Sequence, residues 1–159
     1  MNIVGDLLSG KDVVLGLSAT DAEHACEEIA MIAAHLHKLD DALVFRALWR
    51  REQIGSTGIG HGVAIPHARI PGITTPILLF ARTKLPVPFG ALDHQPISTF
   101  FMILVPEHAI DEHLRILATV SDMLSDRAFR NRLETATEPT EIQRLFNQWT
   151  TKDVAKLVR

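Results

Sequence analysis

The run Gly55-Ser-Thr-Gly-Ile-Gly-His-Gly-Val-Ala-Ile-Pro-His67 separates a helical first part of the chain from a strand-rich middle. Its four glycines lie within eight residues, a density that excludes regular helix. The apolar residues 63–65 then predict a short strand that ends at Pro66, which has no backbone N–H to donate. Because Pro66 fixes its own φ and holds Ile65 extended, the imidazole of His67 leaves the end of a strand on a stiffened backbone.

His67 has two interpretations on this evidence. A side chain that takes part in repeated chemistry benefits from such preorganisation. Loops also carry many histidines without a catalytic role, and the spacing alone does not separate the two interpretations.

The glycines also invite comparison with nucleotide-binding motifs. Gly55 and Gly60 have the spacing of a P-loop, but His61 and Gly62 stand where the motif needs lysine and a hydroxyl residue. A dinucleotide fingerprint needs a strand before its glycines and a helix after them, and here the predicted order is reversed. Neither motif fits, so we do not expect an ATP or NAD site.

Polar groups gather on the same segment. Ser56 and Thr57 supply hydroxyls, and Arg51 supplies a guanidinium on the approach to the glycines. Exposed backbone N–H groups, hydroxyls and an arginine together make a plausible oxyanion site.

The segments before the glycines predict two helices. Apolar residues recur at three- and four-residue steps over residues 21–38, with a capping box from Thr20 to Glu23. A second helix is expected to begin at Asp40 or Asp41 and to end near residue 54. A strand is expected at residues 13–17.

The segments after His67 predict further strands and then helices. Nearly continuous apolar residues predict strands covered on both faces, and two closely spaced prolines predict a loop between them. The predicted elements are strands at 77–83 and 97–105, a loop at 85–90, helices at 110–125, 128–133 and 140–149, and a frayed terminus or helical extension at 152–159. Helices at both ends around buried strands predict one α/β (α+β layered) domain over residues 1–159.

Composition excludes several classes of protein. The chain has 159 residues, 16 Lys and Arg against 19 Asp and Glu, and a formal net charge of −3. Nucleic-acid binders and proteins of anionic membrane surfaces usually show a basic excess. No apolar run approaches the ~18 residues that span a bilayer, and Cys26 is the one cysteine. We therefore expect a cytoplasmic protein that neither binds nucleic acid nor inserts into a membrane.

The glycine-containing run, preceded by Arg51-Glu52, resembles the signature of the EIIA proteins of the bacterial phosphotransferase system. The resemblance is to the mannitol/fructose type and is closest to the nitrogen-related EIIA. It covers nearly the whole chain, and further matching runs are Phe89-Gly-Ala-Leu-Asp-His-Gln-Pro96, Leu104-Val-Pro106 and His113-Leu-Arg-Ile-Leu-Ala118.

The resemblance implies a fold and a chemistry. It implies the mannitol-type EIIA fold, a central mixed β-sheet flanked by helices. It also implies that Nε2 of His67 accepts a phosphoryl group from a phosphorylated carrier similar to HPr or NPr, with His113 beside it and Arg51 supplying positive charge. Ser56 and Thr57 are expected to bind phosphate. No metal or cofactor is expected, and the protein is expected to be a phosphocarrier rather than a free-standing turnover enzyme.

The output of such a carrier has two interpretations. The chain shows no transmembrane segment, which favours the nitrogen-related type, whose phosphorylation changes binding to regulatory targets such as potassium-transport or sensor-kinase proteins. The alternative is a stand-alone mannitol/fructose EIIA that passes phosphate to an EIIB. Remoter alternatives are an interaction module and a metal-dependent hydrolase with His61, His67 and His113 as ligands. We expect a monomer or a weak homodimer.

The remaining histidines have plainer interpretations. We expect the ring at position 61 on the loop surface and those at 94 and 108 exposed beside strands. Solvated positions are expected for His24, His35 and His37, because such residues usually lie on surfaces.

Overall fold

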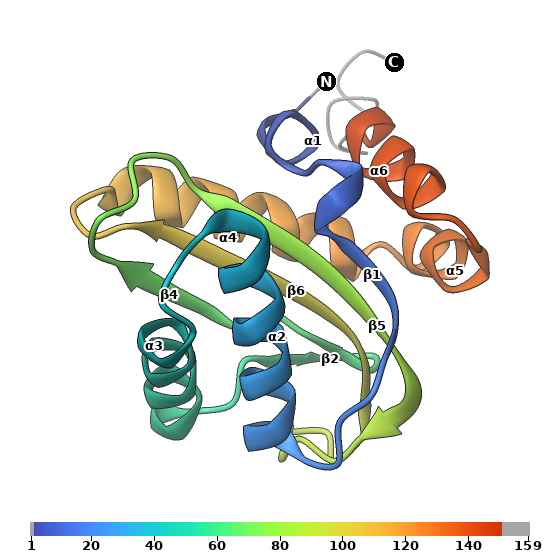
Figure 1. Ribbon diagram of the computed structural model, residues 1–159. Coiled ribbons are helices and arrows are strands. Elements are labelled where there is room, and N and C mark those ends of the chain that lie inside the picture. Colours follow the sequence, from blue (N-terminus) through green and yellow to red (C-terminus); the bar gives the residue numbers. More distant parts are fainter. Residues whose placement is uncertain (1, 151–159) are drawn as a thin grey trace.

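The computed structural model describes residues 2–150 and places six helices, a short 3₁₀ turn and six strands in that range (Figure 1). The helices are α1 (Ile3–Leu7), α2 (Ala22–His37), α3 (Asp41–Ile54), α4 (Ile110–Ser125), α5 (Arg127–Thr135) and α6 (Pro139–Gln148). The strands are β1 (Val13–Leu17), β2 (Gly58–Gly60), β3 (Val63–Ala64), β4 (His67–Ile70), β5 (Ile77–Val87) and β6 (Ile97–Pro106), and η1 is Gly10–Asp12. Residues 152–159, for which a frayed end or helical extension is predicted, lie outside the described range.

The strands form one mixed sheet with the order β1-β5-β6-β3-β2, and β4 also pairs with β6. The long central strands β5 and β6 are antiparallel. β1 runs parallel to β5, and β3 and β4 both run parallel to β6. This arrangement confirms the predicted mixed sheet flanked by helices.

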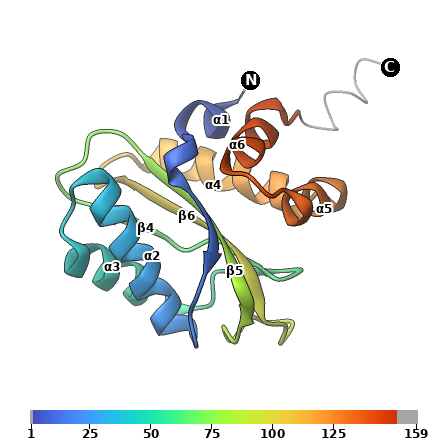
Figure 2. The same cartoon turned by 45° about the vertical axis from the view of Figure 1, so that its right-hand side comes forward.

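Alternate residues of the two central strands enter two separate cores. Phe100, Met102 and Leu104 of β6 pack with α2 and α3, whereas Phe101 and Ile103 pack with the other helices. Figure 2 shows α2 and α3 on one side of the sheet and α4, α5 and α6 on the other. Successive side chains of a strand point to opposite faces, so an unbroken apolar run is what a strand between two helical layers requires.

Three of the helices have an aspartate as their N-cap residue. Asp21, Asp40 and Asp126 each accept backbone N–H groups from the first turn of α2, α3 and α5. The N-cap of α2 is therefore Asp21, and the capping box expected from Thr20 to Glu23 is wrong by one residue. The carboxylate is a good N-cap because it satisfies N–H groups that have no partner inside the helix.

The predicted loop at residues 85–90 is partly wrong, because β5 continues to Val87. Pro86 is compatible with that end of the strand, where residues 84–86 are exposed. The register of β5 against β6 shifts between Arg82 and Val87, and Val87 then pairs with Ile97. A proline is tolerated at such an irregularity because no ladder hydrogen bond is required of it.

The glycine-rich segment forms a β-hairpin rather than an open loop. β2 and β3 are antiparallel, and Gly60 pairs with Val63 across a two-residue turn. The central residues His61 and Gly62 have φ values of 58° and 74°. Positive φ at both central residues suits a two-residue hairpin turn, and glycine adopts it without strain. The predicted absence of helix is confirmed, and the hairpin holds the segment close to the sheet.

The exposure predicted for the histidines is confirmed at four positions and is wrong at His37. The rings at positions 35, 61, 94 and 108 are exposed, as expected. The expectation for His37 is wrong: the ring is half-buried, and its Nε2 lies 2.7 Å from a carboxylate oxygen of Asp12. Asp12 is buried and also accepts hydrogen bonds from the backbone and hydroxyl of Ser9. This contact joins the end of α2 to η1.

Within residues 2–150, none of the helices has both the length and the apolar composition needed to cross a lipid bilayer.

Candidate functional site

The site begins at an interruption in one edge of the sheet. β3 and β4 pair with β6 in the same register, with Ala64 opposite Phe100 and His67 opposite Ile103. Ile65 and Pro66 lie between them, and the backbone N–H of Ile103 donates to the carbonyl of Pro66 at 2.9 Å. Pro66 cannot donate in return, so the ladder breaks there and resumes at His67. The carbonyl of Pro66 faces β6, whereas the N–H of Ile65 bonds to Thr57 on the other side, so the carbonyl of Ile65 points away from the ladder with β6.

The ring of His67 is oriented by that carbonyl. Nδ1 of His67 lies 2.8 Å from the carbonyl oxygen of Ile65. A carbonyl only accepts, so Nδ1 carries the proton and the neutral ring has its lone pair on Nε2. Ala68 and Ile70 pack in the core under α2 and α3, and His67 therefore points to the opposite face, which α4 covers. The sequence could not identify this acceptor.

His113 meets His67 on that face. It is 9% exposed and lies in the first turn of α4, on the same buried stripe as Ile116 and Val120. The centroids of the two imidazoles are 5.4 Å apart, and the ring planes make an angle of 88°. Two residues 46 positions apart in sequence therefore share one small region of the surface.

The protonation of His113 follows from its surroundings. Its Nδ1 is buried and has no hydrogen-bond partner among the described residues. A buried N–H without an acceptor is costlier than a buried lone pair without a donor, because backbone and side-chain N–H groups are rarely left orphaned. We therefore place the proton of the neutral ring on Nε2, which makes this atom a hydrogen-bond donor.

Both rings are held in the neutral form near pH 7. Burial is the largest cause that lowers the pKa of His67, and the positive charge of Arg51 lowers it further. The hydrogen bond to Ile65 and the negative charge of Glu52 oppose that shift. Burial also lowers the pKa of His113, and His67 and Arg69 contribute in the same direction. A neutral imidazole is the nucleophilic form, so this electrostatic setting keeps the lone pair of His67 available.

The last turn of α3 holds the start of the glycine-rich hairpin. The guanidinium of Arg51 donates to the carbonyl of Gly55 at 2.8 Å. Next to it, the buried carboxylate of Glu52 accepts the backbone N–H of Thr57 at 2.9 Å and also its hydroxyl. The hydroxyl of Ser56 accepts the N–H of Gly58 at 3.1 Å. These bonds fix the backbone that leads from α3 to β2.

The predicted site residues have different surroundings. The positive charge of Arg51 lowers the pKa of His67, and the ring of His113 contacts the ring of His67. The hydroxyl of Thr57 is buried and already engaged by Glu52, whereas Ser56 is half-exposed. Phosphate binding by these two hydroxyls stays a prediction.

Glu52 is a residue of the site that the sequence analysis missed. A signal for it exists, since Val44 and Leu48 are buried on α3 and Glu52 continues the same stripe at the next four-residue step. An acidic residue at an apolar position of an amphipathic helix indicates a buried polar role.

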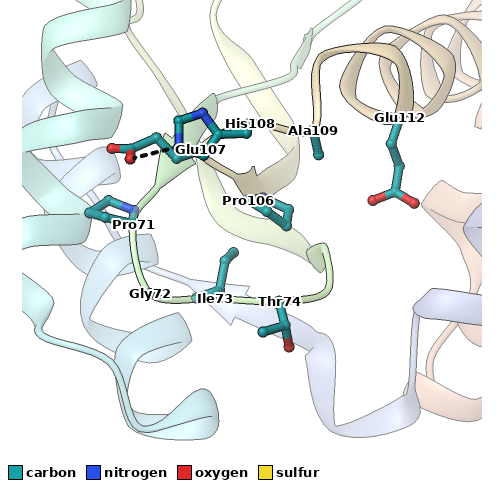
Figure 3. A pocket seen from close by; sticks show the side chains of 9 residues that line it. All are labelled: Pro71, Gly72, Ile73, Thr74, Pro106, Glu107, His108, Ala109 and Glu112. Carbon is teal, nitrogen blue, oxygen red and sulfur yellow. Dashed lines mark ion pairs between the residues drawn. The ribbon is translucent and has the colours of Figure 1, made fainter.

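A groove opens where β4 and β6 end, beside the start of α4 (Figure 3). It has a volume of about 390 Å³ and is lined by residues 71–74, residues 106–109 and Glu112. Glu107 forms an ion pair of 3.6 Å with His108 on its rim. Neither ring of the histidine pair lines the groove, so the two are separate features of the surface.

The described residues contain no group of three or more His, Cys, Asp or Glu side chains placed to hold a metal ion. His61 is exposed at the hairpin turn and does not join the pair formed by His67 and His113. Within residues 2–150, His61, His67 and His113 are therefore not placed together as three metal ligands.

Comparison with known proteins gives matches along most of the chain. The family described as "Phosphoenolpyruvate-dependent sugar phosphotransferase system, EIIA 2" matches residues 6–149. A nitrogen regulatory protein of Pseudomonas aeruginosa is 42% identical over 111 residues, which are 69% of this chain and 72% of that protein. The crystal structure of nitrogen regulatory protein IIA-Ntr from Neisseria meningitidis has a TM-score of 0.85 and 35% identity, and the match covers 91% of this chain and 99% of that one.

The mannitol-type fold is also confirmed. The crystal structure of IIA mannitol from Escherichia coli has a TM-score of 0.71 at 20% identity, and the match covers 87% of this chain and 98% of that one. At this identity the likeness shows the fold alone.

Proposed function

Because this chain belongs to the EIIA-2 family of the phosphoenolpyruvate-dependent sugar phosphotransferase system, we propose that it is a phosphocarrier that accepts a phosphoryl group on Nε2 of His67. The observation that carries the proposal is the 2.8 Å hydrogen bond between Nδ1 of His67 and the carbonyl of Ile65. This bond places the lone pair on Nε2, and the lowered pKa keeps that lone pair unprotonated near pH 7.

The proposed phosphoryl transfer requires neither a metal ion nor an added base. The Nε2 lone pair of His67 attacks phosphorus on a phosphohistidine of the donor, and the donor's P–N bond breaks with its electron pair returning to the donor ring. The new P–N bond leaves Nδ1 protonated, so the phosphorylated ring bears a positive charge that faces the carbonyl of Ile65. No proton has to leave His67 during the step.

Charge on the transferring group is stabilised from both sides of His67. The phosphoryl group carries negative charge on three equatorial oxygens, so positioning and electrostatics supply most of the catalysis. The Nε2–H of His113 donates to one oxygen, and the guanidinium of Arg51 provides positive charge from the end of α3. Ser56 is the hydroxyl we assign to phosphate contact. Thr57 contributes mainly by holding the hairpin through Glu52.

We further propose that the donor is a phosphorylated carrier of the HPr or NPr type and that the output is nitrogen-related regulation in the cytoplasm. The relatives named nitrogen regulatory protein support this proposal. The phosphoryl group itself carries roughly −1.5 to −2 charges, by analogy with other phosphorylated side chains, and the positive charge of the ring offsets part of it, so phosphorylation makes the surface around His67 more negative. Such a change alters the binding of regulatory targets, for which we propose potassium-transport and sensor-kinase proteins.

The second candidate function is delivery of phosphate to the EIIB of a sugar transporter. The family description, which names a sugar phosphotransferase system, favours it. Incubating the phosphorylated chain with purified mannitol- and fructose-specific EIIB proteins distinguishes the two functions. Rapid loss of phosphate from His67 to an EIIB supports the transporter function, and retention supports the regulatory one.

The experiment for the proposed function is phosphorylation of wild type and His67→Ala by a phosphorylated HPr-type carrier. Wild type is expected to take up one phosphoryl group, and His67→Ala none, while its unfolding midpoint stays close to that of wild type. Phosphorylation of folded His67→Ala would contradict the assignment.

A further inference from the structure

Glu52 is a buried acidic residue beside the reacting histidine. It is 8% exposed at the last turn of α3. Its two carboxylate oxygens accept from one residue, Thr57, which donates both its backbone N–H and its hydroxyl. The neighbouring guanidinium of Arg51 donates to Gly55 instead. Burial of a carboxylate costs free energy unless hydrogen bonds satisfy it, and here both oxygens are engaged.

The contacts continue from Thr57 to the ring. The carbonyl of Thr57 accepts the backbone N–H of Ile65 at 3.0 Å. The carbonyl of Ile65 in turn accepts Nδ1–H of His67 at 2.8 Å. Four residues from α3, the hairpin and the start of β4 are thus joined by successive hydrogen bonds that end on the imidazole.

We propose that Glu52 is a positioning residue for phosphoryl transfer, which acts on His67 through the hydrogen-bond chain Glu52–Thr57–Ile65–His67. The inference rests on the proposed phosphorylation of His67. It assigns to Glu52 no contact with the phosphoryl group.

The chain acts first through geometry. Ile65 lies in the interruption between β3 and β4, where the ladder with β6 does not hold its carbonyl. The N–H of Ile65 donates to the carbonyl of Thr57 on the side away from β6, and Thr57 is held by Glu52. Loss of the carboxylate releases Thr57, so the carbonyl that selects the protonated nitrogen of His67 becomes less well placed.

The chain also places a negative charge where it favours the phosphorylated ring. The charged and titratable groups around His67 are Arg51 and Glu52 on α3, His113 on α4 and Arg69 on β4. Among them Glu52 raises the pKa of His67, whereas Arg51 lowers it. Loss of the carboxylate charge is therefore expected to lower the pKa of His67 further and to disfavour the positive charge that the ring bears once phosphorylated.

A purely structural role for Glu52 predicts something different. In that case its loss lowers the free energy of unfolding but changes neither the protonation of His67 in the folded state nor its rate of phosphorylation. The matched control is Asp12→Asn, which removes a second buried carboxylate that also accepts a backbone N–H and a hydroxyl, both from Ser9. The carboxylate of Asp12 also contacts His37, and Asp12 takes no part in the contacts around His67.

The experiment compares four full-length proteins, each labelled with ¹⁵N in its histidine rings: wild type, Glu52→Gln, Glu52→Ala and Asp12→Asn. The ring nitrogen shifts of His67 are followed from pH 5 to 8 by NMR, and phosphorylation is timed with a phosphorylated HPr-type carrier. The NMR readout uses unphosphorylated protein.

Glu52→Gln keeps the shape of the side chain and is expected to lower the pKa of His67. Glu52→Ala is expected to shift the proton of the neutral ring partly from Nδ1 to Nε2 and to slow phosphorylation about tenfold, by analogy with residues that orient metal-bound histidines. Asp12→Asn is expected to match wild type in both readouts. If Glu52→Ala does not fold, the comparison is made with Glu52→Gln and with Thr57→Val. Thr57→Val removes the hydroxyl that donates to Glu52 and keeps the backbone N–H.

The proposal is overturned if both Glu52 variants match Asp12→Asn in the NMR titration and in the rate. The proposed phosphocarrier function has its own test, and it is contradicted if His67→Ala still accepts phosphate from the same carrier. A change in the ring shifts of His67 without phosphate on His67 would therefore show that Glu52 orients the ring, but it would overturn both the phosphocarrier function and a role of Glu52 in phosphoryl transfer.

Discussion

Replacing His113 by glutamine or by asparagine tests separately the two nitrogens of its ring. The amide of glutamine reaches the position of Nε2, and the amide of asparagine reaches that of Nδ1. Since Nδ1 of His113 is buried without a partner among residues 2–150, Nε2 is the atom that we propose as the donor to the phosphoryl group. We therefore expect His113→Gln to keep most of the phosphorylation rate and His113→Asn to lose it.

The size of the loss follows from the kind of bond removed. A hydrogen bond to a charged group contributes about 1.5–3 kcal/mol, which corresponds to about a 10- to 150-fold change in rate. The ring of His113 is 9% exposed, so little water can replace the missing donor. His113→Asn is expected to lie within this range, and His113→Gln within about threefold of wild type, since a flexible amide loses part of one such bond.

The assay is the initial rate of phosphoryl uptake from a phosphorylated HPr-type carrier at pH 7.5, with urea unfolding of each variant as a control for folding. A larger loss in His113→Gln than in His113→Asn would show that Nδ1 is the donor and would refute the assignment. Equal rates for all three proteins would show that His113 does not touch the phosphoryl group.

Three further predictions concern the pH dependence of phosphorylation and two arginines. The phosphorylation rate of wild type should stay flat as the pH falls from 8 to about 6.5, the ordinary pKa of histidine, and decline only below it, because the pKa of His67 is lowered and the neutral ring reacts. Arg51→Gln removes a positive charge that lowers this pKa, so the decline should begin at higher pH than in wild type; an unchanged profile contradicts the electrostatic account. Arg82→Met should lower the free energy of unfolding by about 1.5–3 kcal/mol, because the guanidinium donates to three carbonyls around the end of α5. Urea unfolding measures this, and a loss below about 0.5 kcal/mol, the usual size for a surface substitution, argues against the role.

The layered fold could be predicted because it depends on patterns that lie within single segments. The unbroken apolar residues of β6 predict burial on both faces, and its alternate side chains do enter two different cores. Pro86 led to the wrong prediction of a loop at residues 85–90, because its effect depends on the neighbouring strand. A proline excludes a strand only where a ladder bond is required, and the irregular, exposed end of β5 requires none.

The site could be predicted only in part, because its key contacts cross between segments. The position of His67 after Pro66 and the similarity of this segment to a known motif predict that His67 is the phosphoryl acceptor. The prediction for His113 comes from the same resemblance. The carbonyl of Ile65 leaves no trace in the sequence, since every residue has one. Pairs such as Asp12 and His37, 25 positions apart, likewise become visible only when the chain is folded.

The most direct test of the phosphocarrier account is the site and the atom of phosphorylation. Phosphorylated full-length protein with ¹⁵N-labelled histidine rings can be examined by ¹⁵N and ³¹P NMR, with peptide mapping to identify the residue. We predict one phosphohistidine, at His67, with phosphorus on Nε2 and a proton retained on Nδ1. Phosphate on another histidine, or on Nδ1 of His67, would contradict the account.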